Sequence, residues 1–246
     1  MGVLSIKNIP GDFTLTDKQS FVRKAVKTGQ IMIKDGPKSA FGKIVYPAYY
    51  LDFETANTGI PLYPGIAPYT QIPFLYSVHQ CSAPGKIVSH SAYLADTAVD
   101  CRRQLAENLI RDCGEKGTVF SYSGFEKQII KGLIECCPDL KDSLEKLISR
   151  LVDLKEILAK YIYHPDFRGS YSIKKVLPVL VPDMSYENLE IQDGGEAMAQ
   201  FAWLVRGRYQ GEEIEKVKNS LVRYCGVDTL GMVRVHERVE GMAGVL

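Results

Sequence analysis

Two carboxylates stand two residues apart in the segment Leu51-Asp-Phe-Glu-Thr55. The run from residue 44 to residue 53 is rich in aromatic and branched side chains, which favour a β-strand. Because residues two apart in a strand point to the same face, Asp52 and Glu54 should project together. Two carboxylates held close repel each other unless a cation joins them, and Mg²⁺ or Mn²⁺ suits such oxygen ligands. The alternative is a solvated strand end that carries two exposed acids.

Tyr224 and Asp228 form a second pair, in a stretch with helical periodicity. Residues four apart in a helix lie on one face, one turn from each other. A tyrosine hydroxyl beside a metal-bound carboxylate is able to hold and orient a water molecule, as a two-metal hydrolase requires. The alternative is an exposed Asp228 and a Tyr224 that packs in the core.

A third carboxylate has two candidates. The segment from Gly117 to Glu126 predicts a strand that runs into a helix, and Glu126 lies in the first turn of that helix. An acid in a first turn needs no function, because it complements the helix dipole. Asp153 competes with Glu126 for this role, and its alternative interpretation is an acid on a helix surface.

The segment from Gly169 to Lys175 offers groups that suit phosphate oxygens. Its hydroxyls and amines favour phosphate contacts, and they belong to Ser170, Tyr171, Lys174 and Lys175. The alternative is a helix start with Ser170 or Ser172 as the N-cap and the lysines in solvent. The sequence leaves both interpretations open.

The elements that must position these groups follow from periodicity and from turn residues. Three successive strands without intervening helices indicate an antiparallel meander, and later segments alternate between helix and strand. The expected strands are 44–53, 72–79, 86–94 and 117–122, and the expected helices are 19–27, 98–112, 125–137, 143–161 and 214–239, the last with a break near Gly226. This order predicts a mixed α/β fold. We expect residues 1–43 to be an N-terminal appendage or linker and residues 44–246 to be one domain.

Composition excludes little. The chain has 30 basic and 29 acidic side chains, so its net charge of +1 neither indicates nor excludes a nucleic-acid binder. Its six cysteines lack the C-x-x-C spacing of a zinc knuckle, which favours free thiols in a reducing compartment. No apolar run approaches the length of a membrane span, and the N-terminus lacks a signal peptide. We therefore expect a cytoplasmic protein with no membrane partner.

The order of these motifs resembles the DEDD superfamily of 3′–5′ exonucleases. An acidic pair on the first strand, an acid that opens a later helix, and Tyr224-x-x-x-Asp228 on a late helix are similar to its tyrosine branch. The resemblance implies a ribonuclease-H-like domain. It also implies two ions, Mg²⁺ or Mn²⁺, and hydrolysis of single-stranded DNA or RNA ends to nucleoside 5′-monophosphates.

Longer phrases are similar to an uncharacterised bacterial family of predicted nuclease domains. They are Tyr50-Leu-Asp-Phe-Glu-Thr55, Tyr69-Thr-Gln-Ile-Pro-Phe74, Tyr224-Cys-Gly-Val-Asp-Thr-Leu230, and the stretch from Tyr163 to Pro178. In such families the exonuclease-like domain follows a RecB-type nuclease region, so this resemblance implies a place in a longer polypeptide.

The superfamily resemblance assigns a role to each matching residue. Asp52 would bridge the two ions, Glu54 and Asp228 would complete the ligation of the ion that activates water, and Tyr224 would hold that water. Thr55 would meet the terminal nucleotide. Glu126 stands where the superfamily has aspartate, which leaves the ligation of the second ion open between Glu126 and Asp153.

Two rival functions remain open at this point. A nuclease fold without catalysis would serve as a docking surface for nucleic acid or protein, and low net charge favours it. An endonuclease would use the same metal chemistry within a strand rather than at its end.

Overall fold

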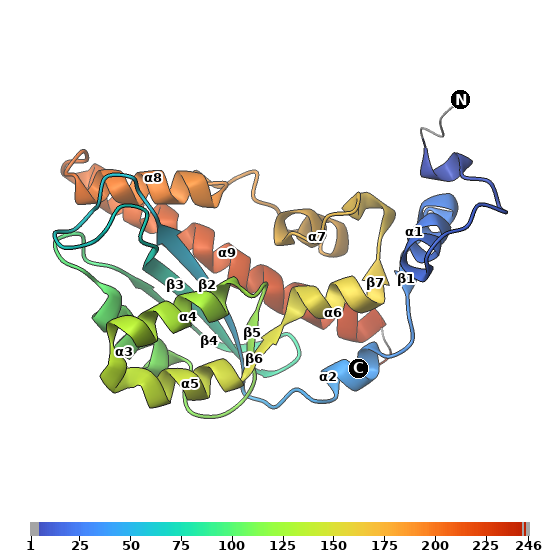
Figure 1. The fold of residues 1–246 in the computed structure, drawn as a ribbon, viewed down its shortest axis with the longest axis horizontal. Coiled ribbons are helices and arrows are strands. Elements are labelled where there is room, and N and C mark those ends of the chain that lie inside the picture. The colour runs from blue at the N-terminus through green and yellow to red at the C-terminus, as the bar shows by residue number, and fades with distance from the viewer. Residues whose placement is uncertain (1–4, 243, 245–246) are drawn as a thin grey trace.

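The computed structural model describes residues 5–242 and residue 244. A five-stranded sheet in the order β4-β3-β2-β5-β6 forms its centre, as Figure 1 shows. The meander β2–β3–β4 is antiparallel, and β5 and β6 run parallel to β2. The strands are β2 (Ala48–Ala56), β3 (Ile72–Ala83), β4 (Lys86–Leu94), β5 (Val119–Ser121) and β6 (Leu151–Asp153). The predicted mixed α/β fold class is confirmed: the sheet has a three-strand antiparallel meander plus parallel strands and is flanked by helices.

Helices cover both faces of the sheet (Figure 1). One core joins odd-numbered β2 residues, such as Leu51 and Phe53, to α3 (Arg102–Asp112), α4 (Phe125–Cys136) and α5 (Lys141–Ser149). The other core contains Tyr50 and the buried side of α9 (Glu212–Met242), with α7 (Ile173–Leu180) and α8 (Gly194–Val205). Since strand residues alternate, Asp52 and Glu54 lie on the α9 face with Tyr50.

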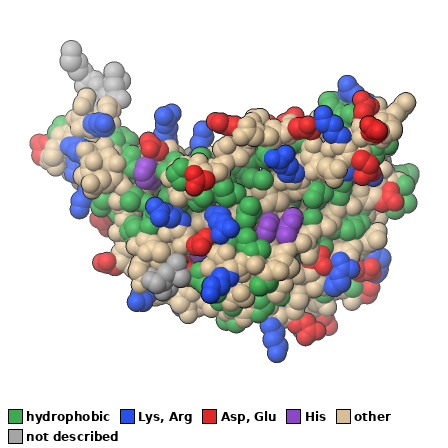
Figure 2. All heavy atoms as spheres, turned by 180° about the vertical axis from the view of Figure 1, so that it is seen from behind, with side chains coloured by type: hydrophobic (Ala, Val, Ile, Leu, Met, Phe, Trp, Pro, Cys, Tyr) green, Lys and Arg blue, Asp and Glu red, His purple; other side chains and the backbone are tan. Residues whose placement is uncertain are grey.

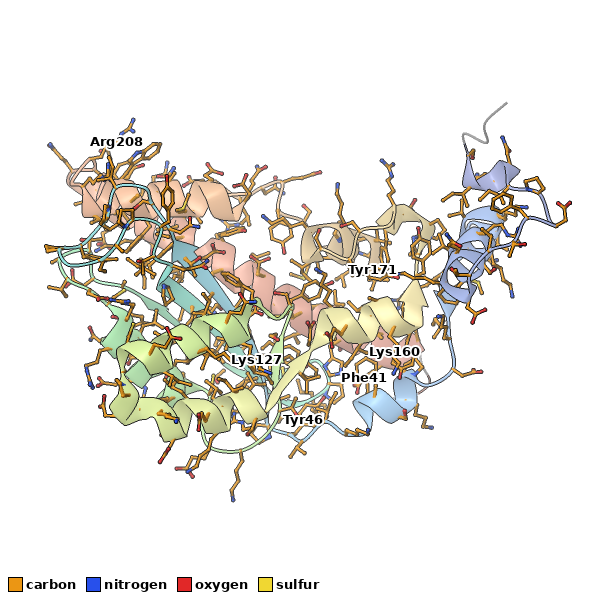
Figure 3. All side chains as sticks on the ribbon, in the orientation of Figure 1. Phe41, Tyr46, Lys127, Lys160, Tyr171 and Arg208 are labelled. Atoms are coloured by element: carbon orange, nitrogen blue, oxygen red, sulfur yellow. The ribbon has the colours of Figure 1, made fainter. Side chains whose placement is uncertain are left out.

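The N-terminal segment packs against the far end of this second layer. It contains η1 (Ile6–Asn8), α1 (Asp17–Thr28) and α2 (Pro37–Phe41), and its β1 (Met32–Ile33) pairs with β7 (Ile162–Tyr163). Thr16 caps α1 through a capping box with Gln19, so the helix begins at Asp17, two residues before the predicted start. The ring of Phe41, labelled in Figure 3, stacks 4.8 Å from the ring of His236 on α9. The division into an appendage, 1–43, and a domain, 44–246, stays a prediction.

The predicted helix over residues 143–161 is wrong. The chain forms α5, then β6, then α6 (Leu154–Tyr161). Leu151-Val-Asp153 pairs with β5, and the Arg150 guanidinium donates to the carbonyls of Cys113, Gly114 and Gly117 at 2.5–2.9 Å. Helical spacing on both sides of a three-residue strand hides it from any search for local periodicity.

Other boundaries differ in smaller ways. β2 begins at Ala48, after Pro47, and α3 begins at Arg102 rather than residue 98. α9 passes through Gly226 without the predicted break, and the His90 ring lies against that glycine. The remaining short helices are η2 (Pro138–Leu140) and η3 (Pro165–Phe167). Within the described part of the chain, no helix has the length and apolar character needed to cross a bilayer.

Candidate metal centre

Three potential metal ligands from β2 and α9 lie close together. One ligand atom each of Asp52, Glu54 and Cys225 lies within 4.8 Å of the other two. A register shift between Glu54 and Thr55 marks a bulge in β2 at this point, and bulges re-aim side chains beside functional sites. The predicted pairing of Asp52 and Glu54 on one strand face therefore leads into a compact cluster with a thiol.

Asp228 completes the acidic cluster from the next turn of α9. Its side chain is 7% exposed and accepts a hydrogen bond of 2.5 Å from the hydroxyl of Tyr186. Its charge is the strongest electrostatic influence on Asp52 and on Glu54. The ring of the buried Tyr224 lies 6.4 Å from the ring of Tyr186. Burial raises the pKa of Tyr224, and the charges of Asp228, Glu54 and Asp52 add to that effect. The structure thus brings together the two pairs predicted from the sequence.

Burial and mutual repulsion oppose ionisation of these carboxyls. Burial and the charges of Asp228, Glu54 and Glu126 raise the pKa of Asp52 well above its usual value. Burial, and then Asp228, raise the pKa of Glu54 to about 8. Burial raises the pKa of Asp228 to about 6, against the lowering effects of Tyr186 and Lys174. A divalent cation would reverse this balance, because it stabilises the charged forms.

The donor set fits such a cation. Glu54 is 7% exposed, and no donor from the described residues hydrogen-bonds to its carboxylate. A buried carboxylate without a partner is costly unless a cation neutralises it. Asp52, Glu54 and Asp228 would hold the ion through oxygen, and Cys225 places sulfur at the same point.

Glu126 is a further buried carboxyl, in the first turn of α4. It is 2% exposed, and the Ser123 hydroxyl lies 3.4 Å from its Oε2. Burial is the main cause that raises the pKa of Glu126 to about 7, and Asp153 adds to it. Glu126 in turn raises the pKa of Asp52. Asp153 accepts a hydrogen bond from the backbone of Glu156 and caps α6. Of the two candidates, Glu126 is therefore the carboxyl that acts on Asp52.

Lys174 is a cation close to the acidic cluster. Its Nζ lies 5.0 Å from the Tyr224 ring centre and donates to the Gln192 carbonyl at 2.7 Å. Its charge lowers the pKa of both Glu54 and Asp228. Lys174 is thus placed to meet an anion held beside the carboxylates.

The other predicted nucleic-acid contacts have different surroundings. The Tyr171 hydroxyl, on the residue labelled in Figure 3, donates to the Ile162 carbonyl at 2.7 Å. Ser170 accepts from the Ser172 backbone, and Lys175 is exposed. Thr55 accepts a hydrogen bond of 2.9 Å from the Gln71 side chain, which ties the β2–β3 loop to the acidic strand. Ser170 and Tyr171 therefore make hydrogen bonds within the protein. Their role in binding nucleic acid stays a prediction.

Sequence reasoning missed two members of the site. Cys225 could have been found, because it lies three residues before Asp228 and so on the same helix face. Tyr186 gave no signal, because it lies in the irregular segment between α7 and α8, where no period fixes the direction of a side chain.

The fold and this cluster define an α/β protein with a buried acidic centre. The chain belongs to the family described as a domain of unknown function (DUF2779), whose family model matches residues 49–172. The match contains Asp52, Glu54, Glu126 and Asp153. Tyr224 and Asp228 lie beyond it, on α9.

One curated protein is similar to this chain over more residues than the family model matches. It is an uncharacterized protein, UU173, of Ureaplasma parvum serovar 3 (strain ATCC 700970), and it is 22% identical over 244 residues. The match covers 85% of this chain and 33% of that protein, so the chain spans about a third of the relative's length. No solved structure matches this chain.

Proposed function

We propose that the protein is a metal-dependent nuclease, a 3′–5′ exonuclease on single-stranded DNA or RNA. One observation carries this proposal: Asp52 and Glu54 of β2 place ligand atoms within 4.8 Å of each other and of Cys225 on α9, and the charges of Asp228 and Glu126 also act on Asp52. Such a cluster suits the two divalent ions, Mg²⁺ or Mn²⁺, of a phosphodiester hydrolase. The order of its members along the chain adds the resemblance to the DEDD superfamily.

Each of these side chains would have its own role in hydrolysis. When bound, divalent ions would supply positive charge to the attacking and leaving oxygens of the phosphodiester. Asp52, Glu54, Asp228 and Glu126 would hold the ions. Tyr224 would orient a water molecule, and Lys174 would bind a phosphate oxygen. The water oxygen forms the new bond to phosphorus as the bond to the 3′ oxygen breaks, which releases a nucleoside 5′-monophosphate.

A second candidate is a catalytically inactive module that docks nucleic acid or protein. Lys174 favours it, since its ammonium group offsets the charge of Glu54 and Asp228 without any metal. The expectations of a cytoplasmic location and of a RecB-type nuclease region in a longer polypeptide stay predictions.

Digestion of end-labelled strands tests the proposal. With Mn²⁺, we expect the wild-type chain to shorten a 5′-labelled single strand into a ladder and to release the 3′ label as a mononucleotide. Asp52→Asn and Asp228→Asn should lose at least about a hundredfold in rate, because each removes a ligand charge. Asp142→Asn, at an exposed site on α5, is the matched control and should cleave like the wild type.

The remaining outcomes separate the rival functions. Cleavage of a closed circular strand at the same rate would indicate an endonuclease. If no labelled DNA or RNA is degraded and calorimetry detects no Mn²⁺ binding, the nuclease proposal is wrong and the docking module is favoured.

A further inference from the structure

We propose that the thiol of Cys225 is a ligand of the metal held by Asp52 and Glu54, and that this sulfur makes the centre select a transition-metal ion over Mg²⁺. The inference deepens the proposed function, because it concerns the same site. It assigns a role to a residue that the carboxylate chemistry does not use.

The geometry suits a sulfur ligand. Cys225 Sγ lies 3.6 Å from Asp52 Oδ2, and a Glu54 oxygen is within 4.8 Å of both residues' ligand atoms. Zinc–sulfur bonds are about 2.3 Å and zinc–oxygen bonds about 2.0–2.2 Å, so a sulfur and an oxygen donor of one tetrahedral ion stand about 3.6 Å apart. The 3.6 Å between Cys225 Sγ and Asp52 Oδ2 matches that separation, and the Glu54 oxygen lies close enough to join the same ion.

The fold holds the thiol in this position. Even-numbered residues of β2 face α9, and Cys225 lies one turn before Asp228 on the helix face that meets them. The sulfur is also 3.7 Å from the Asp52 backbone carbonyl, so it lies directly over the strand. The side chain is completely buried.

Glu54 supplies an independent indication of a cation at this point. Its side chain is more than nine-tenths buried and has no hydrogen-bond donor among residues 5–242 and 244, yet it points at the sulfur and at Asp52. A neutral thiol alone does not satisfy that carboxylate. An ion bound to all three groups would satisfy Glu54, and the thiol proton would pass to solvent as the metal–sulfur bond forms.

Sulfur changes which metal binds best. Mg²⁺ requires hard oxygen donors in near-octahedral geometry, whereas thiolate favours softer ions such as Zn²⁺ and Co²⁺. A sulfur donor in place of one oxygen donor should therefore raise the affinity of the centre for Zn²⁺ and Co²⁺, whereas Mg²⁺ should bind weakly.

Cobalt absorption tests the sulfur directly, without an activity assay. The full chain is freed of metal with a chelator, titrated with Co²⁺, and followed by thiolate-to-cobalt charge-transfer absorption in the near ultraviolet. We expect the band in the wild type and its loss in Cys225→Ser. Zn²⁺ and Co²⁺ affinity, measured by calorimetry, should fall at least about tenfold in that variant, with Mg²⁺ affinity changed less than about twofold.

Cys113→Ala is the matched control, since Cys113 is also fully buried but lies in the core between the sheet and α3–α5. It should keep the cobalt band. The wild-type measurement does not depend on whether a variant folds. If calorimetry shows that the wild type binds cobalt but no thiolate band appears, the inference is overturned. An unchanged band in Cys225→Ser would also overturn it. A failure to bind Zn²⁺ or Co²⁺ more tightly than Mg²⁺ would contradict it equally.

The test is separable from that of the proposed function. A thiolate band in a chain that cleaves no nucleic acid would retain this metal centre and reject the nuclease. Cleavage with Mg²⁺ in a chain that shows no thiolate band would retain the nuclease and reject the sulfur ligand.

Discussion

Burial raises the pKa of Asp52, Glu54 and Asp228, and the charge of Asp228 raises the pKa of the other two further, so these carboxyls keep their protons to higher pH than free carboxyls do. Ionisation of the metal-free cluster therefore opposes folding. The unfolded chain ionises these groups near their ordinary values, so at neutral pH the folded chain binds more protons than the unfolded chain.

The metal-free protein should lose stability as pH rises. The penalty is absent below the unfolded pKa values near 4, grows up to the folded pKa of Glu54, about 8, and then levels off. We expect the thermal midpoint, measured by scanning fluorimetry with a chelator, to fall from pH 5 to pH 8, by about 2–4 °C for each kcal/mol lost. At pH 8, Mn²⁺ should restore it.

A matched pair of variants isolates the cluster from other titrating groups. In Glu54→Gln the thermal midpoint should fall less between pH 5 and pH 8, because the amide has no charge to bury. The rise of the midpoint with Mn²⁺ should also be smaller in this variant. Glu145→Gln, at an exposed site on α5, should behave like the wild type. Equal pH profiles for the wild type and Glu54→Gln would show that Glu54 does not carry this penalty.

At the scale of elements, the turn before β5 fixes how that strand lies against β2. Thr118 donates from its backbone to Val45 and accepts from the Tyr49 backbone, each at 2.8 Å. Gly117 has φ +92, and a Cβ there would lie 1.8 Å from the Pro47 carbonyl oxygen. The close approach of two backbones at this turn therefore sets the register of the strand that carries the acidic pair.

Gly117→Ala should be severely destabilising, by more than about 3 kcal/mol, because both the positive φ and the backbone overlap oppose a side chain. Chemical denaturation of the two purified proteins measures the difference. Gly132→Ala on α4 is the control: its Cβ meets nothing within 4 Å, and alanine should stabilise the helix by about 0.5–1 kcal/mol. Similar effects at the two positions would contradict the proposed backbone approach.

At the scale of the whole molecule, charge is unevenly distributed although the net charge is +1. Residues 1–43 carry eight lysines and arginines but three aspartates. Figure 2 shows several basic side chains, with fewer acidic ones, on the lobe next to the grey N-terminal residues. If the proposed nuclease activity is correct, the basic side chains of this segment would hold the phosphate backbone of a strand whose end reaches the carboxylates.

Reversal of charge on this lobe should weaken nucleic-acid binding without removing the metal centre. Lys18→Glu, Lys24→Glu and Lys38→Glu together should lower affinity for a single strand, measured by fluorescence anisotropy in Ca²⁺. They should also reduce the salt slope by about 0.7 for each phosphate that the lobe no longer neutralises. The control combines Lys127→Glu, Lys131→Glu and Lys141→Glu on α4 and α5, where Figure 3 labels Lys127. Equal losses of affinity in the two triple variants would contradict a dedicated basic lobe.

The sequence alone determined the features that depend on near neighbours. Alternation placed Asp52 and Glu54 on one face of β2, and helical spacing placed Tyr224 and Asp228 on one face of α9. These predictions hold because a period is set by residues within one or two turns of each other.

Only the tertiary structure decided which distant residues meet. Cys225 reaches Asp52 across 173 positions, and Tyr186 reaches Asp228 from an irregular segment. β6 exists as a strand because β5 and Arg150 hold it, while its own three residues lie between two helical patterns. Such contacts depend on how sheet and helices pack, and local sequence patterns do not encode that packing.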